Sequence, residues 1–462
     1  MTNDGRLDLA ESILDVIGNT PIVKVKRLSA AHGVRATIAI KMEPLNPGGS
    51  AKDRVAVAMI DAAERDGLIK PGGTIVEPTS GNTGVGLAIV AAQRGYKCVF
   101  VVTDKVSPIK VDLLRAYGAE VVVCPVSVPP EDDNSYYSTA ERLSREIPGA
   151  YRPNQYANPN NPLAHEHSTG PEIWRQTAGT VTHFVAGMGT GGTITGTGRY
   201  LKQKNPDVII IGADSESSVY TGGSGRPYLV EGIGEDFFPE TIDLSVVDHA
   251  YPISDEDSFL MARELARVEG ILVGGSGGSA VAAALHHAKL ADLGPEHLIV
   301  VLVPDSGRGY LAKEFNDTWM ESFGFLRRDG ITVETVLTAR RSSTPSLLYV
   351  NPEQPVKDAI DLMRTHEISQ LPVIKNEPPF ANAEVAGSVD EVRLMHLALA
   401  DPSSLDKPVG LVMGPKLATV GIGQSLEHAV AQLGEASALL VLKGGRPHTV
   451  LARADVLRYL RG

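Results

Sequence analysis

From about residue 37 to residue 320, short apolar segments rich in β-branched residues alternate with longer segments that carry Ala, Leu and charged residues at helical spacing. The apolar segments predict strands at 37–41, 74–77, 97–102, 120–123, 181–186, 208–212 and 297–303. The intervening segments, such as 53–66, 83–94, 107–117 and 278–293, predict helices. This alternation is typical of an α/β fold, in which helices cover both faces of a mostly parallel sheet. Ligands of such folds bind at the carboxyl ends of the strands.

The pattern changes after about residue 325. Gly324, the pair Asp329-Gly330 and the polar stretch 340–345 indicate a boundary, so we assign residues 1–325 to a first domain and 326–340 to a linker. Residues 341–400 and 408–462 then form a weak repeat, and each copy is predicted to be a β-α-β-β-α unit. One such unit leaves an apolar face uncovered, so we expect the two copies to pack as a pair.

Composition narrows the classes of function. The 462 residues include 43 Lys and Arg against 55 Asp and Glu, which gives a net charge of −12 and argues against a nucleic-acid partner. No apolar segment approaches the roughly 20 residues that span a bilayer, and the polar first residues do not resemble a secretory signal. We therefore expect a cytoplasmic protein without a membrane partner. Cys98 and Cys124 lie in apolar segments and are expected to be buried, unreactive thiols.

The first of four loops that follow predicted strands is Asn46-Pro-Gly-Gly-Ser-Ala-Lys-Asp-Arg54, which opens a helix and places Lys52 in its first turn. The helix dipole disfavours an ammonium there, so the amine of Lys52 loses its proton more easily. A neutral lysine amine is what imine chemistry with an aldehyde requires. Taken alone, a lysine at such a place is more commonly a solvated surface residue.

Two further loops carry short polar side chains. Residues 77–84 contain Thr79, Ser80, Asn82 and Thr83 ahead of a predicted helix, whose first amides can bind an anion such as a carboxylate. The alternative is that these side chains only cap the helix. Ser306, after the last apolar strand, either caps a turn or forms a hydrogen bond with a bound heterocycle.

The fourth loop, Gly187-Met-Gly-Thr-Gly-Gly-Thr193, predicts a phosphate site, because consecutive glycines let backbone amides surround one phosphate. The same loop fits the dinucleotide pattern through Gly187, Gly189 and Gly192, with Asp214 about 20 residues further on. A nicotinamide-dependent dehydrogenase therefore stays open as an alternative. Taken together, the four loops on one side of one predicted sheet indicate a phosphorylated aldehyde cofactor.

Over about residues 8–320 the sequence resembles the β-family, or fold type II, pyridoxal-phosphate enzymes. The resemblance is carried by Gly18-Asn-Thr-Pro21, Pro47-Gly-Gly-Ser-Ala-Lys-Asp-Arg54, Thr79-Ser-Gly-Asn-Thr-Gly84, Gly189-Thr-Gly-Gly-Thr193 and Pro304-Asp-Ser306. It implies a core like that of the tryptophan synthase β subunit and pyridoxal 5'-phosphate as cofactor.

The resemblance also implies roles for individual residues. Lys52 would bind the cofactor covalently and later move a proton, Asn82 would contact the ring hydroxyl, and Ser306 would contact the pyridine nitrogen. The phosphate would be held by Gly189, Thr190, Gly191, Gly192 and Thr193. The substrate carboxylate would be contacted by Thr79, Ser80, Thr83 and Gln155.

Within this family the sequence resembles the cystathionine β-synthases. The O-acetylserine sulfhydrylases, or cysteine synthases, share the motifs, but residues 231–239 and the paired repeat, which resembles a tandem CBS-domain (Bateman) module, favour the former. The resemblance implies a lyase of transsulfuration that joins L-serine and L-homocysteine to L-cystathionine and water, with cysteine synthase as the alternative. Glu235 stands where the family has Tyr, and no haem is expected, because the haem-binding extension of animal relatives is missing.

Tandem modules of this kind often bind adenosyl ligands through a Thr-x-x-Asp pattern. Residues 452–455 keep Asp455 without the Thr, and residues 390–393 have neither. S-adenosylmethionine as an allosteric ligand and a module that binds nothing are both open. The resemblance further implies a homodimer or homotetramer that acts on small amino-acid substrates. His165 and His167 flank Glu166 at a spacing that suits no common zinc motif, so we predict no metal site.

Overall fold

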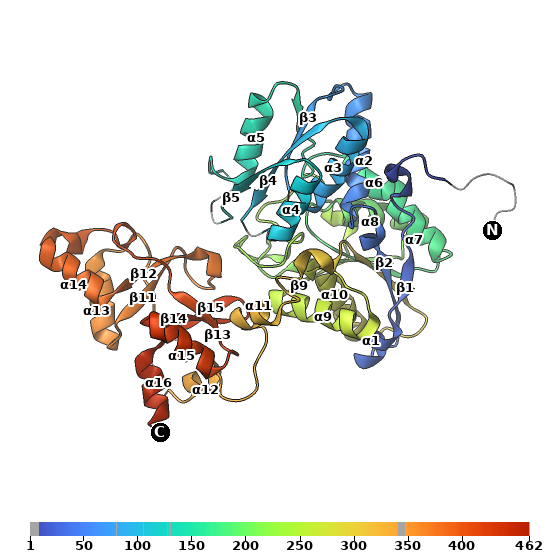
Figure 1. Cartoon of the computed structure of the whole chain (residues 1–462). Helices are drawn as coiled ribbons and strands as arrows, with labels where there is room; N and C mark the ends of the chain where they lie inside the picture. Colours follow the sequence, from blue (N-terminus) through green and yellow to red (C-terminus); the bar gives the residue numbers. More distant parts are fainter. Residues whose placement is uncertain are drawn as a thin grey trace. The chain divides into compact units, whose positions relative to one another are not determined.

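The computed structural model describes residues 9–79, 81–104, 106–126, 128, 131–340 and 347–461. The chain divides into two compact units, Met1–Leu311 and Ala312–Gly462 (Figure 1). The division lies before the expected domain end at residue 325, because the residues after α11 (Asp317–Ser322) pack on the second repeat, where the Gly445 N–H donates to the Phe323 carbonyl at 2.8 Å. The expected linker 326–340 contains the helix α12 (Val333–Thr338), whose Val333 and Val336 are buried in the core of that repeat.

A six-stranded sheet forms the centre of the first unit. Its strands run in the order β1 (Ile22–Lys24), β2 (Thr37–Met42), β10 (Leu298–Val303), β7 (His183–Gly187), β8 (Ile209–Ser215) and β9 (His249–Ile253). All neighbours are parallel except the edge strand β1, which is antiparallel to β2. Since parallel strands end at the same edge, the loops after β2, β7 and β10 lie together.

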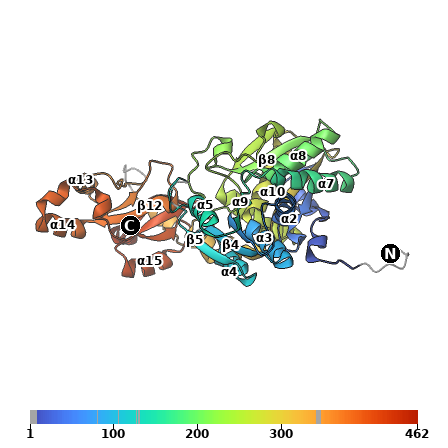
Figure 2. The same ribbon diagram turned by 90° about the horizontal axis from the view of Figure 1, so that it is seen from above.

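A second, four-stranded parallel sheet has the order β5 (Glu120–Cys124), β4 (Lys97–Thr103), β3 (Thr74–Pro78) and β6 (Ala150–Tyr151). The expectation of one sheet was therefore wrong, because the loop that carries Asn82 follows β3 in this second sheet. Helices α2 (Lys52–Arg65), α3 (Asn82–Arg94) and α4 (Pro108–Ala116) share one apolar core with the sheet, and α5 (Tyr136–Glu146) packs on another side (Figures 1 and 2).

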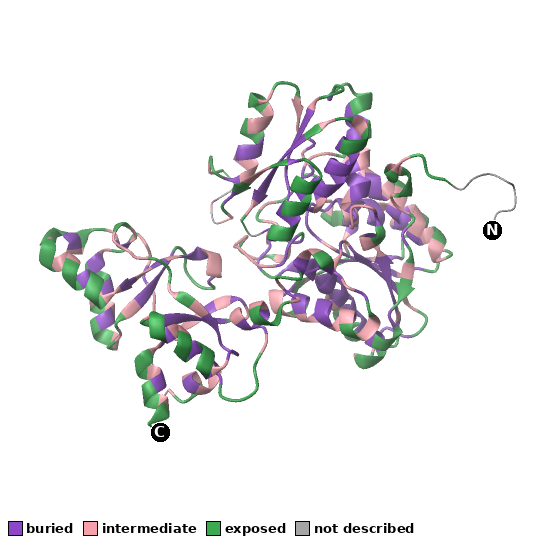
Figure 3. Ribbon diagram, in the orientation of Figure 1, coloured by how far each residue is buried: buried purple, intermediate pink, exposed green. Residues whose placement is uncertain are grey.

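The remaining helices cover the six-stranded sheet and its connections. They are α1 (Lys26–Ala31), α6 (Asn160–Ala164), the π-helical η3 (His165–Thr169), α7 (Gly170–Gln176), α8 (Gly192–Lys204), α9 (Asp255–Glu269) and α10 (Gly275–Leu290). In Figure 3 the strands are largely buried, whereas the helices are buried on their inner faces and exposed outside. Both cysteines are buried as expected, and burial raises the pKa of the Cys98 thiol to about 12.

The second unit consists of the two predicted β-α-β-β-α repeats. In the first, a bridge from Val350 to Val373 precedes α13 (Val356–His366), β11 (Gln370–Ile374), β12 (Val385–Asp390) and α14 (Glu391–Ala400). The second contains β13 (Ala418–Gly421), α15 (Leu426–Glu435), β14 (Ala438–Lys443), β15 (Arg446–Ala452) and α16 (Arg453–Leu460). The repeats pack as a pair, since Ile374 and Val385 share an apolar cluster with Leu440 and Leu442.

None of the helices in the described ranges combines the length and the apolar character needed to cross a membrane.

Candidate active site

Lys52 lies at the start of α2, beside the loop that follows β10. The two loops meet because β2 and β10 are parallel neighbours, with Met42 opposite Val303 at their carboxyl ends. The Ala51 N–H donates to the Pro304 carbonyl at 2.8 Å, and Ser50 forms a β-bridge with Asp305. The segment that carries Lys52 is thus fixed directly against the segment that carries Ser306.

The electrostatic surroundings of Lys52 favour a neutral amine. Desolvation by the surrounding protein lowers the pKa of Lys52 from 10.5 to about 8, and the negative charge of Glu235 opposes this shift. The sequence predicted this direction from the helix dipole, whereas the structure attributes the lowered pKa mainly to desolvation. Lys52 itself is half-buried rather than exposed.

Asn82 begins α3 and points to the same loop after β10. Its side-chain amide donates to Asp305 Oδ2 at 2.8 Å, and the Tyr310 hydroxyl donates to the same oxygen at 2.6 Å. Ser306 lies next to Asp305 and caps the short helix η6 (Gly307–Tyr310), since its Oγ accepts the Arg308 N–H at 3.3 Å. The capping role expected for Ser306 is therefore present, and its position still places it beside Lys52 and Asn82.

The residues predicted to contact a substrate carboxylate meet at the start of α3. Thr79 Oγ1 accepts the N–H groups of Gly81 and Gly84 at 3.1 and 3.2 Å, so this side chain caps the helix, as the alternative interpretation expected. Thr83 donates its hydroxyl to Gln155 Oε1 at 2.7 Å. Thr79, Thr83 and Gln155 are all buried, whereas Ser80 lies outside the described residues.

The glycine-rich loop after β7 leads into α8 through Gly191, which has a positive φ of 81° and forms the N-cap. A Cβ at Gly192 would overlap Asn161 Oδ1, and one at Gly189 would lie 2.6 Å from the Gly232 carbonyl oxygen, so neither position accepts a side chain. Among the described residues, no acceptor exists for the backbone N–H groups of Gly189, Thr190, Gly191 and Thr193. Such a group of amides at a helix start is suited to an anion.

A continuous series of hydrogen bonds links this loop to the others. Thr83 contacts Gln155, the Asn161 amide donates to the Gln155 carbonyl at 2.8 Å, and the same amide donates to Thr190 Oγ1 at 3.0 Å. The loops predicted to bind cofactor and substrate are therefore joined by hydrogen bonds among the described residues, although they belong to two sheets.

The family comparison agrees with this geometry. The family described as "Pyridoxal-phosphate dependent enzyme" matches residues 13–305, and the one described as "CBS domain" matches residues 341–390. The chain belongs to the pyridoxal-phosphate-dependent enzymes.

Individual relatives of this enzyme family point to a narrower group. The cystathionine beta-synthase of Apis mellifera is 46% identical over 320 residues, which are 68% of this chain and 63% of that protein. That of Mus musculus is 43% identical over 372 residues, 78% of this chain and 66% of that protein. The chain thus spans slightly less than two thirds of these relatives. The solved O-acetylserine dependent cystathionine beta-synthase from Helicobacter pylori is 39% identical with a TM-score of 0.62, over 66% of this chain and 99% of that one.

The residues present fit pyridoxal phosphate. The amides of the glycine-rich loop, which have no acceptor among the described residues, suit its phosphate, and the lowered pKa of Lys52 suits its aldehyde. The dinucleotide alternative fits less well, because Asp214 Oδ2 accepts the N–H and hydroxyl of Thr221 at 3.1 and 2.9 Å and so holds its own loop.

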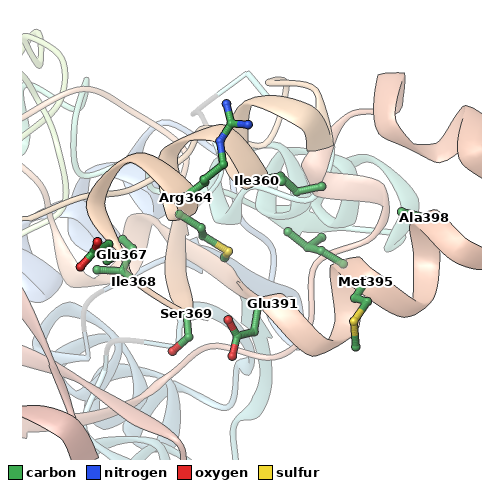
Figure 4. Close-up of a pocket in the computed structure, with 10 residues that line it drawn as sticks. Ile360, Arg364, Glu367, Ile368, Ser369, Glu391, Met395 and Ala398 are labelled. Atoms are coloured by element: carbon green, nitrogen blue, oxygen red, sulfur yellow. The ribbon is translucent and has the colours of Figure 1, made fainter.

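In the second unit, Asp455 is already engaged. Its Oδ2 accepts the Ala452 N–H at 2.8 Å, which caps α16, and it forms an ion pair with Arg340. An open cavity of about 530 Å³ lies elsewhere, against α13 and α14 (Figure 4). It is lined by Ile360, Met363, Arg364, Glu367, Ile368, Ser369, Glu391, Leu394, Met395 and Ala398. The residue predicted to be regulatory does not line this cavity.

Sequence reasoning missed two residues that support the glycine-rich loop. Asn161 contacts Thr190, and His165 Nε2 lies 3.1 Å from Thr193 Oγ1. The spacing of His165 and His167 predicts no role for His165, because it suits no common metal motif. Its fully buried position at a π-helical turn is the structural signal that distinguishes it.

Proposed function

We propose that the protein is a pyridoxal-phosphate-dependent lyase that joins L-serine and L-homocysteine to form L-cystathionine and water. The observation that carries the proposal is the meeting of Lys52, Asn82, Ser306 and the glycine-rich loop at the carboxyl ends of strands in two sheets. The relatives named cystathionine beta-synthase support the choice of reaction.

Each loop has a distinct task in this proposal. When bound, pyridoxal phosphate supplies an aldehyde that reacts with amines and a ring that withdraws electrons from the substrate Cα. The loop from Gly189 to Thr193 binds the phosphate, Asn82 contacts the ring hydroxyl, and Ser306 contacts the ring nitrogen. Because Ser306 is neutral, it offers that nitrogen no negative charge, as an aspartate there would.

Lys52 holds the cofactor and moves protons. Its Nζ would hold the cofactor at the aldehyde carbon and, once free, would accept the proton from the substrate Cα. Thr79, Ser80, Thr83 and Gln155 bind the α-carboxylate and orient the Cα–H bond toward Nζ. Overall, the sulfur of the second substrate would replace the β-hydroxyl group at Cβ, and the hydroxyl group would leave with the thiol proton as water.

The test has two parts. The purified protein should be yellow, the colour should be lost on borohydride reduction, and Lys52→Ala should abolish turnover. Products are then compared for serine with homocysteine and for O-acetylserine with sulfide. A colourless protein that stays active as Lys52→Ala contradicts the proposal, and faster turnover of O-acetylserine with sulfide assigns a cysteine synthase instead.

A cystathionine synthase that uses O-acetylserine is the second candidate. It is favoured by the relative from Helicobacter pylori, which is named as O-acetylserine dependent and covers 66% of this chain. Supplying homocysteine with either serine or O-acetylserine and comparing kcat/KM for cystathionine formation separates the two.

We propose S-adenosylmethionine as the ligand of the paired repeats, in a cytoplasmic homodimer or homotetramer. A ribose that approached Asp455 would have to displace Arg340, so binding should be accompanied by movement of Arg340. Calorimetric titration with S-adenosylmethionine, with Asp455→Ala as the control, tests the ligand. If the titration gives no heat of binding, or the same heat in Asp455→Ala as in the wild type, a site at Asp455 is contradicted. Light scattering measures the oligomeric state.

A further inference from the structure

The segment 160–169 reaches the glycine-rich loop from outside the motifs that the family resemblance identified. It consists of α6 followed by the π-helical turn His165–Thr169. Helix α8 packs tightly on it, since a Cβ at Gly196 would overlap the Pro162 carbonyl oxygen and lie 2.9 Å from the Glu166 nitrogen. This close backbone contact brings two side chains of the segment to the two threonines of the loop.

We propose that His165 and Asn161 are positioning residues, which turn the hydroxyl hydrogens of Thr193 and Thr190 toward the cofactor phosphate. The inference rests on the proposed function, in which the loop from Gly189 to Thr193 holds that phosphate. It assigns to His165 and Asn161 a role in cofactor binding without direct contact with the cofactor.

The hydrogen bonds of His165 define the direction of this arrangement. His165 is fully buried, its Nδ1 lies 2.9 Å from Thr169 Oγ1, and its Nε2 lies 3.1 Å from Thr193 Oγ1. Burial, helped by the positive charges of Lys52 and Arg54, lowers the pKa of His165 well below 6.5, so the imidazole is neutral. A neutral imidazole has one donor and one acceptor nitrogen.

A bound phosphate selects between the two tautomers. If Thr169 donates to Nδ1, then Nε2–H donates to Thr193 Oγ1, and the Thr193 hydroxyl hydrogen is directed to the phosphate. In the opposite tautomer Thr193 donates to His165, and only its oxygen lone pairs face the anion. The first arrangement supplies a charge-assisted hydrogen bond, whereas the second is repulsive.

Asn161 imposes the same direction on Thr190. Its Nδ2 donates to the Gln155 carbonyl at 2.8 Å, and this acceptor fixes which end of the amide faces Thr190. The same Nδ2 donates to Thr190 Oγ1 at 3.0 Å. Thr190 Oγ1 therefore accepts here, and its own hydrogen is left for the phosphate.

The experiment measures cofactor affinity rather than activity. Apoenzyme of wild type, His165→Phe and Thr193→Val is titrated with pyridoxal phosphate and, separately, with pyridoxal, which lacks the phosphate. A lost hydrogen bond to a charged group should weaken pyridoxal phosphate binding by about 10- to 100-fold in each variant and leave pyridoxal binding unchanged. The ³¹P resonance of the bound cofactor should also shift in both variants.

A matched control comes from the same segment. His167 is exposed, so His167→Phe should bind both compounds like the wild type. Because His165 acts through Thr193, the two substitutions should not add. The double variant His165→Phe/Thr193→Val should bind pyridoxal phosphate as tightly as the single variant with the lower affinity. The inference is overturned if the losses of pyridoxal phosphate affinity in the two single variants multiply in the double variant. It is also overturned if pyridoxal affinity falls equally, or if His165→Phe binds pyridoxal phosphate like the wild type.

If His165→Phe does not fold, the same titrations with Asn161→Asp still test the proposal. It replaces the amide donor by a carboxylate that can only accept, so Thr190 must turn its hydrogen away from the phosphate. Weaker binding of pyridoxal phosphate at unchanged pyridoxal binding supports the proposal, and wild-type affinity refutes it. A wild-type protein that binds neither compound refutes the proposed function instead.

Discussion

Replacing Arg54 by methionine should strongly destabilise the first unit. Arg54 is buried and forms hydrogen bonds to Glu43 at 2.7 and 2.9 Å and to Glu172 at 2.7 and 2.9 Å. Glu43 is completely buried, and Arg54 is the cation that pairs with it. Removing one partner of a buried ion pair leaves an uncompensated charge, which costs about 3–5 kcal/mol.

The size of this effect depends on Glu43 more than on Glu172. Glu172 keeps a second cation, because Lys41 Nζ lies 2.5 Å from Glu172 Oε2. Among the described residues, the hydrogen-bond donors that Glu43 keeps are neutral, namely the Thr20 hydroxyl at 2.6 Å and the Asn46 amide at 2.8 Å. The double variant Arg54→Met/Glu43→Gln removes both charges and should therefore be more stable than Arg54→Met alone.

The assay is urea unfolding followed by tryptophan fluorescence. The chain has 2 tryptophans, Trp174 in the first unit and Trp319 in the second, so a Trp319→Phe background reports on the first unit alone. Arg94→Met is the matched control. Arg94, at the end of α3, pairs with Asp61 and Glu64 of α2, the helix that also carries Arg54. These pairs lie at the surface, where an ion pair contributes about 0–1 kcal/mol. Equal losses for Arg54→Met and Arg94→Met would refute the reasoning.

Three further predictions concern pH and the glycine-rich loop. Covalent uptake of pyridoxal phosphate by the apoenzyme, followed by absorbance, should accelerate as pH rises through about 8, because only neutral Lys52 reacts. The negative charge of Glu235 raises the pKa of Lys52, so Glu235→Gln should move the pH profile of uptake to lower pH. Burial and neighbouring histidines lower the pKa of His183 from 6.5 to about 4. The melting temperature should therefore be highest above pH 6.5 and fall progressively as pH falls toward 4, because the unfolded chain takes up the proton first. His183→Asn should make this fall smaller. Gly192→Ala should weaken pyridoxal phosphate binding at least tenfold in equilibrium titrations, because the added Cβ overlaps Asn161; unchanged affinity contradicts the assigned phosphate site.

Local signals were sufficient to predict most elements of the first unit. The predicted strand 74–77 is β3 (Thr74–Pro78) and the predicted strand 297–303 is β10 (Leu298–Val303), and both are buried on each face. β9 (His249–Ile253) was not predicted, because it is a mostly exposed edge strand without a continuous apolar run. α12 was not predicted either, since its few apolar residues lie in a segment with loop composition.

The division into two sheets could not be predicted from local patterns. Strand pairing joins segments far apart in the chain, as where β10 lies between β2 and β7, and an apolar run does not indicate its neighbours. The loops after the strands were recognisable nonetheless, because glycines and short polar residues at a strand end give a local signal. That is why Lys52, Asn82 and Ser306 could be singled out although they follow strands of different sheets.

The supporting residues of the site gave no comparable signal. His165 lies 28 residues from Thr193, and Asn161 lies 29 residues from Thr190. Their contacts depend on the close approach of α8 to the segment 160–169, which Gly196 permits. A single glycine within a helical pattern does not indicate which segment will pack against it.

The proposed function requires a covalent bond between Lys52 and pyridoxal phosphate. The purified holoenzyme is reduced with borohydride and digested, and the peptides are analysed by mass spectrometry. We expect the reduced cofactor on the peptide that contains Lys52, at Nζ, and no adduct in Lys52→Ala. A holoenzyme whose Lys52 is unmodified, or whose adduct lies on another lysine, would contradict it.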